Sequence, residues 1–240
     1  MIKPAKLSDL SPDRSPKSET KGFLKLERET LNDRAYREIK RAIIAGAITP
    51  GSSMTIRGLA QAFGTSPMPV REALNRLVSE RVLQLLPNRS VTLPLMTAER
   101  FREICRIRIL LEGEMVETGA QLVDPEELAV LDNLNQEMHR MKPRDSIRYL
   151  AANQDFHFAL CRTARMPLAM SIIESLWVQA GPFLHFGINE LALKHGMEYH
   201  SAAVEAMRRR NGKAARAAVT RDISDAADEI SRHLQKTAQD

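Results

Sequence analysis

The sequence predicts a mainly α-helical protein with an N-terminal winged helix-turn-helix and a C-terminal all-α antiparallel helical bundle. Helix patterns followed by a short hairpin occupy residues 30–94, which is the element order of a winged helix. Helix then follows helix with short loops across residues 95–240, which is typical of a bundle. Residues 1–29 are polar and rich in Lys, Ser and Pro, so we expect a flexible tail rather than a basic arm.

Spacing and breaker residues define the first two helices. Ile39 and Ile43 recur at helical spacing, and Gly46 stops that helix. Thr55 can cap a second, short helix, which Gly64 closes with a tight turn. A helix, a glycine turn and the helix that follows form the helix-turn-helix plan.

The third helix is expected to begin at Ser66, whose hydroxyl can cap it. Pro67 occupies the first helical position, where a missing N–H costs nothing. Arg71 and Asn75 lie one turn apart on a face that can point outward. A helix N-terminus that carries an arginine suits both phosphate contact and base reading. The buried stripe is expected to be Val70, Leu74, Leu77 and Val78.

A hairpin follows the third helix. Residues 82–86 and 91–93 are strand-like runs separated by a turn at residues 87–90, with Arg89 at its tip. Helices followed by a hairpin with a basic tip make a winged helix, and we expect Arg89 to contact DNA. The alternative is a plain helical bundle with a hairpin appended.

The second half of the chain contains helix signals throughout. Thr97 caps a long helix, residues 124–127 have the form of a capping box, and Pro143 breaks the chain. The helices are expected over residues 97–122, 124–141, 145–165, 166–182, 183–195, 197–210 and 213–235.

Composition limits the class of protein and its surroundings. The formal net charge of +5 favours a polyanionic partner. Cys105 and Cys161 lack metal-binding spacing and fall on apolar helix faces, which indicates buried, reduced thiols. The sequence has no signal peptide and no run that spans a bilayer, so a cytoplasmic protein is expected, with no membrane partner.

Four residues of the second half carry metal-binding chemistry. Asn153 and His157 are four positions apart and share a helix face, while His200 and Asp222 lie on later helices. Amide oxygen, imidazole nitrogen and carboxylate oxygen all bind divalent metals. Spacing alone favours the alternative, in which the histidines are ordinary core or surface residues.

Residues 30–94 resemble the winged-helix domain of the GntR family of bacterial transcription regulators. The resemblance implies that Arg57, Ser66 and Arg71 contact DNA. The chain departs from the family at Pro67, where arginine is usual, and at Ser90, where the wing usually has glycine. The matching segments are Ala45-Gly46, Pro50-Gly51, Leu59-Ala60, Phe63-Gly64, Pro69 through Leu74, and Pro87-Asn88-Arg89.

Residues 97–235 resemble the all-helical, FCD-type effector domain of the FadR-like branch of this family. Its metal-containing form implies a divalent ion held by Asn153, His157, His200 and Asp222, with Asp222 where histidine is usual. Zinc, nickel or manganese suits two nitrogens and two oxygens. The matching segments are residues 108–112 and 153–157, Glu198-Tyr199-His200, and the alanine-rich last helix.

The resemblance also implies a small carboxylate effector. Arg108 is a suitable partner because guanidinium binds carboxylate through two hydrogen bonds. The alternative for Arg108 is an ion pair with Glu112, and the two roles are compatible.

The chain is therefore expected to be a ligand-responsive transcription regulator, most simply a repressor, acting as a homodimer on double-stranded operator DNA. A metal-dependent enzyme with an appended nucleic-acid-binding domain is the alternative, but the sequence offers no defensible nucleophile and base. A non-specific architectural DNA binder would not need so large a helical half.

Overall fold

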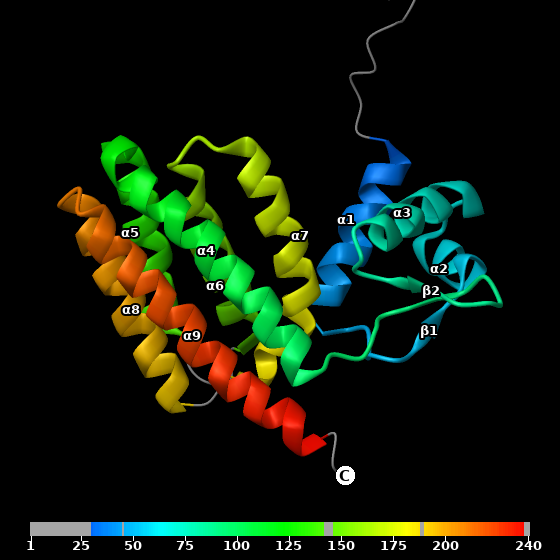
Figure 1. Ribbon diagram of the computed structural model, residues 1–240. Helices are drawn as coiled ribbons and strands as arrows, with labels where there is room; N and C mark the ends of the chain where they lie inside the picture. The colour runs from blue at the N-terminus through cyan, green and yellow to red at the C-terminus, as the bar shows by residue number, and fades with distance from the viewer. Residues whose placement is uncertain (1–29, 45, 142–145, 188–189, 238–240) are drawn as a thin grey trace, which may run out of the picture. The chain divides into compact units, whose positions relative to one another are not determined.

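A computed structural model describes residues 30–44, 46–141, 146–187 and 190–237. Within these ranges the chain forms nine α-helices, a 3-10 turn and three short strands (Figure 1). The mainly α-helical class expected from the sequence is confirmed. The predicted tail, residues 1–29, and the predicted break at Pro143 lie outside the described residues.

The N-terminal part combines three helices with a small sheet. Helices α1 (Leu31–Ile44), α2 (Ile56–Phe63) and α3 (Pro67–Ser79) enclose a hydrophobic cluster that includes Ile39, Leu74 and Leu77. Strand β3 (Val91–Thr92) lies between β1 (Ser53–Met54) and β2 (Gln84–Leu85), antiparallel to both. The hairpin was predicted, but β1 was not, because two residues are too few for an alternating pattern.

The predicted caps of this part are observed at two of three sites. The Thr55 hydroxyl accepts the Gly58 N–H, and Gly64 ends α2 in the left-handed conformation. Ser66 occupies the N-cap position of α3, but its hydroxyl makes no capping hydrogen bond. The prediction of a bonded cap was wrong: Pro69, at the third helical position, has no N–H to donate, and the remaining donor, the Met68 N–H at the second position, is not bonded by the Ser66 hydroxyl.

The C-terminal part consists of six further helices. Thr97 caps the first of them, and Asp124 and Glu127 form the predicted capping box at the second. Helices α8 and α9, joined by residues 209–211, run antiparallel (Figure 1). The bounds are α4 Ala98–Leu122, α5 Pro125–Arg140, α6 Ser146–Arg162, α7 Pro167–Leu184, α8 Glu190–Arg208 and α9 Gly212–Thr237.

Three helix ends differ from the predictions. Helix α6 ends at Arg162, and the chain turns at Arg165 in the left-handed conformation. Helix α7 continues through Pro182 in its last turn, where the proline removes one hydrogen bond to the carbonyl four residues earlier. Helix α8 passes through Gly196, which packs closely against Tyr149. Gly196 therefore serves close packing rather than chain reversal.

The helical part has its own core. Helix α4 packs along α9, and α8 also lies against α9, while α5 contacts α6 and α8. The largest buried side chains of this core include Phe101, Met115, Phe156 and Trp177. Cys105 and Cys161 are both buried and unpaired. None of the described helices has the length and hydropathy needed to cross a membrane.

Candidate functional site

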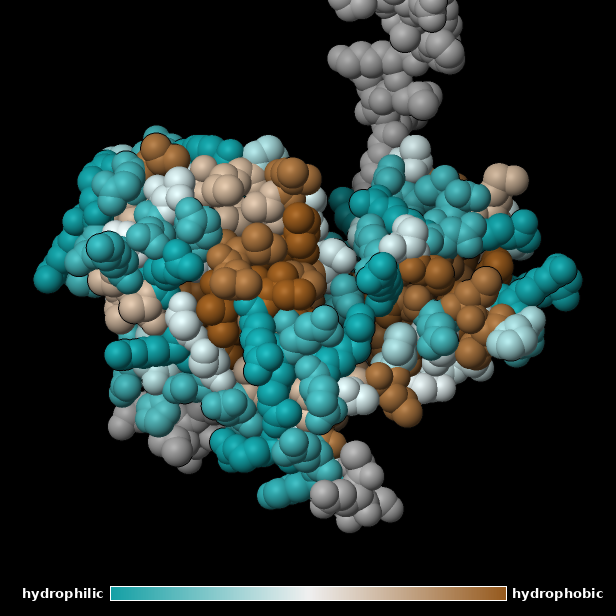
Figure 2. All heavy atoms as spheres, in the orientation of Figure 1, coloured by the Kyte–Doolittle hydropathy of each residue, from teal (hydrophilic) through white to brown (hydrophobic). Residues whose placement is uncertain are grey.

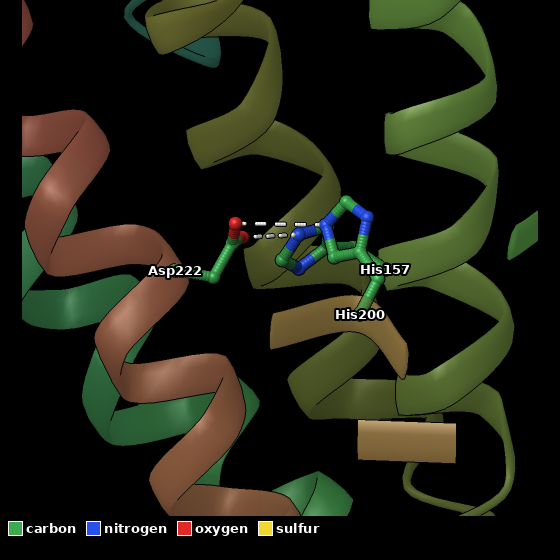
Figure 3. A group of neighbouring side chains, drawn as sticks. All are labelled: His157, His200 and Asp222. Carbon is green, nitrogen blue, oxygen red and sulfur yellow. Dashed lines mark hydrogen bonds and ion pairs between the residues drawn. The ribbon is translucent and has the colours of Figure 1, made fainter. Parts of the chain in front are cut away.

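Three helices of the C-terminal part bring two histidines and a carboxylate together (Figure 3). His157 comes from α6, His200 from α8 and Asp222 from α9, and one candidate ligand atom of each lies within 4.8 Å of the others. His157 Nε2 lies 2.9 Å from Asp222 Oδ2, and His200 Nε2 lies 3.5 Å from Asp222 Oδ1. Asn153 is half-buried one turn before His157 on α6.

His200 has a buried ring with unused hydrogen-bonding capacity. Its side chain is 2% exposed, and neither ring nitrogen has a hydrogen-bond partner among the described residues. A buried polar atom without a partner costs free energy, and such an atom requires an explanation. Two imidazoles and a carboxylate are competent donors for a borderline divalent metal. The donor set therefore fits a metal ion, as do the unpartnered Nδ1 of His200 and its Nε2, which lies at the edge of hydrogen-bond range of Asp222.

His157 lies between two carboxylates. Its Nδ1–H donates to Glu112 Oε2 at 2.8 Å, and its Nε2–H donates to Asp222 Oδ2. Burial disfavours the charged ring, but these hydrogen bonds outweigh burial and raise the pKa of His157 to about 9. Burial likewise disfavours the Asp222 carboxylate, yet His200 and His157 hold its pKa well below the usual range.

Glu112 connects this cluster to Arg108. Its Oε1 accepts from Arg108 Nε at 2.6 Å and from Trp177 Nε1 at 3.1 Å, while Oε2 accepts from His157. Burial alone raises the pKa of Glu112, but Arg108 and His157 lower it to about 2. A carboxylate behind a histidine fixes which ring nitrogen faces a metal. Glu112 thus holds Nδ1 and leaves Nε2 directed at Asp222.

Arg108 is buried rather than open to solvent. Its guanidinium pairs with Glu112 and stacks over the Trp177 ring at 3.9 Å, so the ion pair weighed as the alternative is present. Neither Trp177 nor Tyr149 was among the residues predicted to bind a metal or an effector. Tyr149 is one turn before Asn153, and burial followed by Asp222 raises its pKa above the usual range. The one sequence signal that could have placed Tyr149 here is its four-residue spacing from Asn153, which puts both on one helix face.

The five predicted DNA-contacting residues are all exposed. Arg57 lies on α2, Ser66 precedes α3, and Arg71 and Asn75 lie on the outward face of α3. Arg89 is at the tip of the hairpin in the left-handed conformation. Their role in DNA binding stays a prediction.

Arg76 shows how an arginine of α3 is held within the protein. It donates to Glu80 at 3.0 Å and stacks over Tyr36, whereas Arg71 forms no ion pair with the described residues. Arg71 is therefore available to an external anion.

Two family descriptions match the chain. Residues 31–93 match "Bacterial regulatory proteins, gntR family", and residues 103–225 match "FCD domain". The HTH-type transcriptional regulator McbR of Escherichia coli K12 is 30% identical over 199 residues, covering 81% of this chain and 90% of McbR. The Bacillus subtilis gluconate operon transcriptional repressor is 28% identical over 166 residues, covering 66% of this chain and 64% of that protein.

Solved structures agree with these relatives. The structure of E. coli McbR/YncC has a TM-score of 0.78 at 27% identity, covering 86% of this chain and 99% of that one. A GntR regulator from Rhodococcus sp. RHA1 has the same fold, with a TM-score of 0.69 at 24% identity over 83% of this chain and 96% of that one. Because the matched family and McbR are transcription regulators, the chain is a regulator and not an enzyme. The chain belongs to the GntR family of bacterial transcription regulators, with an N-terminal DNA-binding domain and a C-terminal FCD domain.

Proposed function

We propose that this regulator is a cytoplasmic homodimer that represses transcription from a two-fold symmetric operator. A divalent metal bound in the helical part, together with a small carboxylate, controls its release from DNA. The DNA-binding domain is proposed to span residues 30–94 and the effector and dimerisation domain residues 95–240. The observation that carries the proposal is the buried His200 ring, whose Nδ1 has no partner among the described residues and whose Nε2 faces Asp222 at 3.5 Å without a full hydrogen bond, beside His157.

Asn153, His157, His200 and Asp222 would hold the metal. Two nitrogen and two oxygen donors suit zinc, nickel or manganese. A metal requires a neutral imidazole, so His157 must lose its Nε2 proton while Glu112 keeps the Nδ1 proton in place. The bound ion would supply a positive charge to which a carboxylate binds.

The balance of charge supports an anionic effector. The charges of Arg108 and Glu112 cancel each other. When His157 is neutral, a divalent cation beside the single negative charge of Asp222 leaves the site with a net charge of about +1. A buried site with excess positive charge is costly unless an anion enters it. A monocarboxylate completes the balance, with Arg108 as its second partner.

Helix α7 supports a connection between this cluster and the DNA-binding helices. Trp177 contacts Glu112 and Arg108, while the adjacent Val178 is buried in the cluster formed by α1 and α3. Two further α7 residues, Ser175 and Gln179, donate to the backbone carbonyl of Glu80 at the end of α3, at 3.4 and 3.5 Å. A shift of Trp177 on ligand binding is thus transmitted through one rigid helix.

A repressor is favoured by the names of relatives. The RspR protein of E. coli K12 is described as a transcriptional repressor and is 23% identical over 216 residues, and the gluconate operon regulator also carries that description. To test the proposal, an operator is first selected from a random DNA library with the full-length chain. Its dissociation constant is then measured with zinc and a panel of hydroxy and sugar acids. Weaker binding with an acid supports release of the protein from DNA by a carboxylate effector, and tighter binding or no change contradicts such release.

Arg71→Ala should weaken binding to the selected operator by about 1–3 kcal/mol, because one side chain that contacts a base edge is lost. Fluorescence anisotropy at fixed salt measures the effect. Arg140→Ala, which removes the same charge from an exposed position on α5, is the matched control and should bind as the parent does. Equal affinity of Arg71→Ala and the parent would remove α3 as the recognition helix.

An exposed apolar face on α4 and α7 supports the homodimer. Leu110 is 62% exposed on α4, Leu168 is 77% exposed on α7, and Ile107 and Ile172 are also exposed. Figure 2 shows hydrophobic side chains gathered over these two helices. Contiguous exposed apolar surface marks an interface, and a two-fold dimer uses the same patch on both chains.

Leu110→Glu should therefore convert the full-length dimer to a monomer, because two carboxylates would be buried at the interface. Sedimentation equilibrium at micromolar concentration measures the mass. Val130→Glu, at an exposed apolar position on α5, should leave the dimer intact. A monomeric parent, or a dimeric Leu110→Glu variant, would exclude this face as the interface.

A further inference from the structure

The outward face of α3 carries one large apolar side chain. Met68, in the first turn, is 70% exposed. Arg71, Glu72 and Asn75 are also exposed and follow at helical spacing, so the four side chains share one face. The helix is held to its core by other positions, which are Pro69, Val70, Ala73, Leu74 and Leu77.

This face is the one that a recognition helix turns toward DNA. In a helix-turn-helix the second helix enters the major groove, and the residues near its N-terminus contact base edges. Here α2, the left-handed turn at Gly64 and α3 form that motif. Met68 lies one turn before Arg71, and it therefore reaches the bases when α3 lies in the groove.

The start of α3 is poor in hydrogen-bond donors. Pro67 and Pro69 have no backbone N–H, and the thioether of Met68 has no donor. Contact of the Met68 side chain with a base edge is therefore apolar. Among the groups that base pairs present in the major groove, the 5-methyl group of thymine is the apolar one. The flexible, polarisable methionine side chain adapts its shape to such a partner.

We infer that Met68 determines operator specificity by packing against a thymine 5-methyl group. The inference deepens the proposed function, because it rests on the contact of α3 with operator DNA. It adds an apolar contact to the polar ones assigned to Arg71 and Asn75. Each half-site of the operator should consequently contain a thymine whose methyl group contributes to affinity.

The test uses the full-length chain and the operator selected from a random library. Each thymine is replaced in turn by uracil, which pairs identically but lacks the methyl group, and binding is followed by fluorescence anisotropy at fixed salt. One replacement per half-site should weaken the parent about fourfold, the factor expected for one buried methyl group. Met68→Ala should bind the unmodified operator at least fourfold more weakly than the parent does. Its affinity should not change when that thymine is replaced by uracil.

Two variants serve as controls. Met68→Leu keeps an apolar side chain and should keep the response to uracil. Leu95→Ala removes another exposed apolar side chain, 74% exposed, and should match the parent on every duplex.

The inference is overturned if no replacement of thymine weakens the parent, or if Met68→Ala responds to uracil as strongly as the parent. If the parent instead selects no sequence above random DNA, the proposed operator binding fails as well.

Discussion

Replacing Glu112 by alanine is expected to lower the free energy of unfolding by about 3–5 kcal/mol. The carboxylate is fully buried and accepts hydrogen bonds from Arg108, Trp177 and His157. Its removal leaves a buried guanidinium, an indole N–H and an imidazole N–H without their acceptor. The free-energy cost of these unsatisfied donors exceeds the cost of the lost side-chain packing. Urea denaturation of the metal-free full-length chain measures the change.

An exposed carboxylate provides the control for Glu112. Glu205 pairs with Arg209 at the same four-residue spacing, but both side chains are exposed to solvent. Glu205→Ala should therefore leave the urea midpoint of unfolding almost unchanged. Comparable losses in the two variants would show that the Arg108–Glu112 pair is not the buried ion pair described here.

The contribution of the Glu112 charge should also depend on pH. Its pKa is about 2 in the folded chain against an ordinary value of 4.5, since Arg108 and His157 outweigh the effect of burial. A lowered pKa gives stability that is fully present above pH 4.5 and is lost as the pH falls toward 2. The difference between the parent and Glu112→Gln should therefore shrink across that window.

His200→Ala should abolish the response to metal and carboxylate while leaving DNA binding in the absence of ligand unchanged. The substitution removes a buried imidazole that faces Asp222 and makes no full hydrogen bond. The affinity for zinc should fall by more than about 100-fold, because that factor is the upper range for losing a residue that only supports a metal ligand. The DNA-contacting residues lie on α2, α3 and the hairpin and are not altered. Calorimetry with zinc and anisotropy with the selected operator give the two readouts.

His139 offers a matched histidine for this experiment. It is exposed on α5, where its Nδ1 lies 2.8 Å from the Asn135 carbonyl oxygen. His139→Ala should bind zinc and operator as the parent does. If His200→Ala retains the zinc affinity of the parent, His200 is not a metal ligand, and the metal does not explain its buried ring nitrogens.

Local signals predicted most of the fold. Thr55, Thr97 and Asp124 cap helices through contacts within three residues, and such contacts can be read from the sequence. Gly196 and Pro182 misled the prediction because their local preference for a break is overridden by packing. Pro69 removes one of the two N–H groups that a Ser66 cap could use, so the sequence made a bonded cap less favourable without excluding it.

The candidate site was predictable only in part. Asn153 and His157 share a helix face by spacing, but that His157, His200 and Asp222 meet depends on how α6, α8 and α9 pack. Glu112 was recognised as a partner for Arg108, one helical turn away. Its contact with His157 spans 45 positions and requires the tertiary structure.

The metal content of the purified full-length chain tests the central claim most directly. The chain is incubated with excess zinc, dialysed, and analysed by plasma mass spectrometry beside His157→Ala and His200→Ala. We predict one ion per chain in the parent and loss of that ion in both variants, because His157, His200 and Asp222 present their ligand atoms to one point. A parent chain that retains no zinc, or variants that retain as much zinc as the parent, would contradict the account.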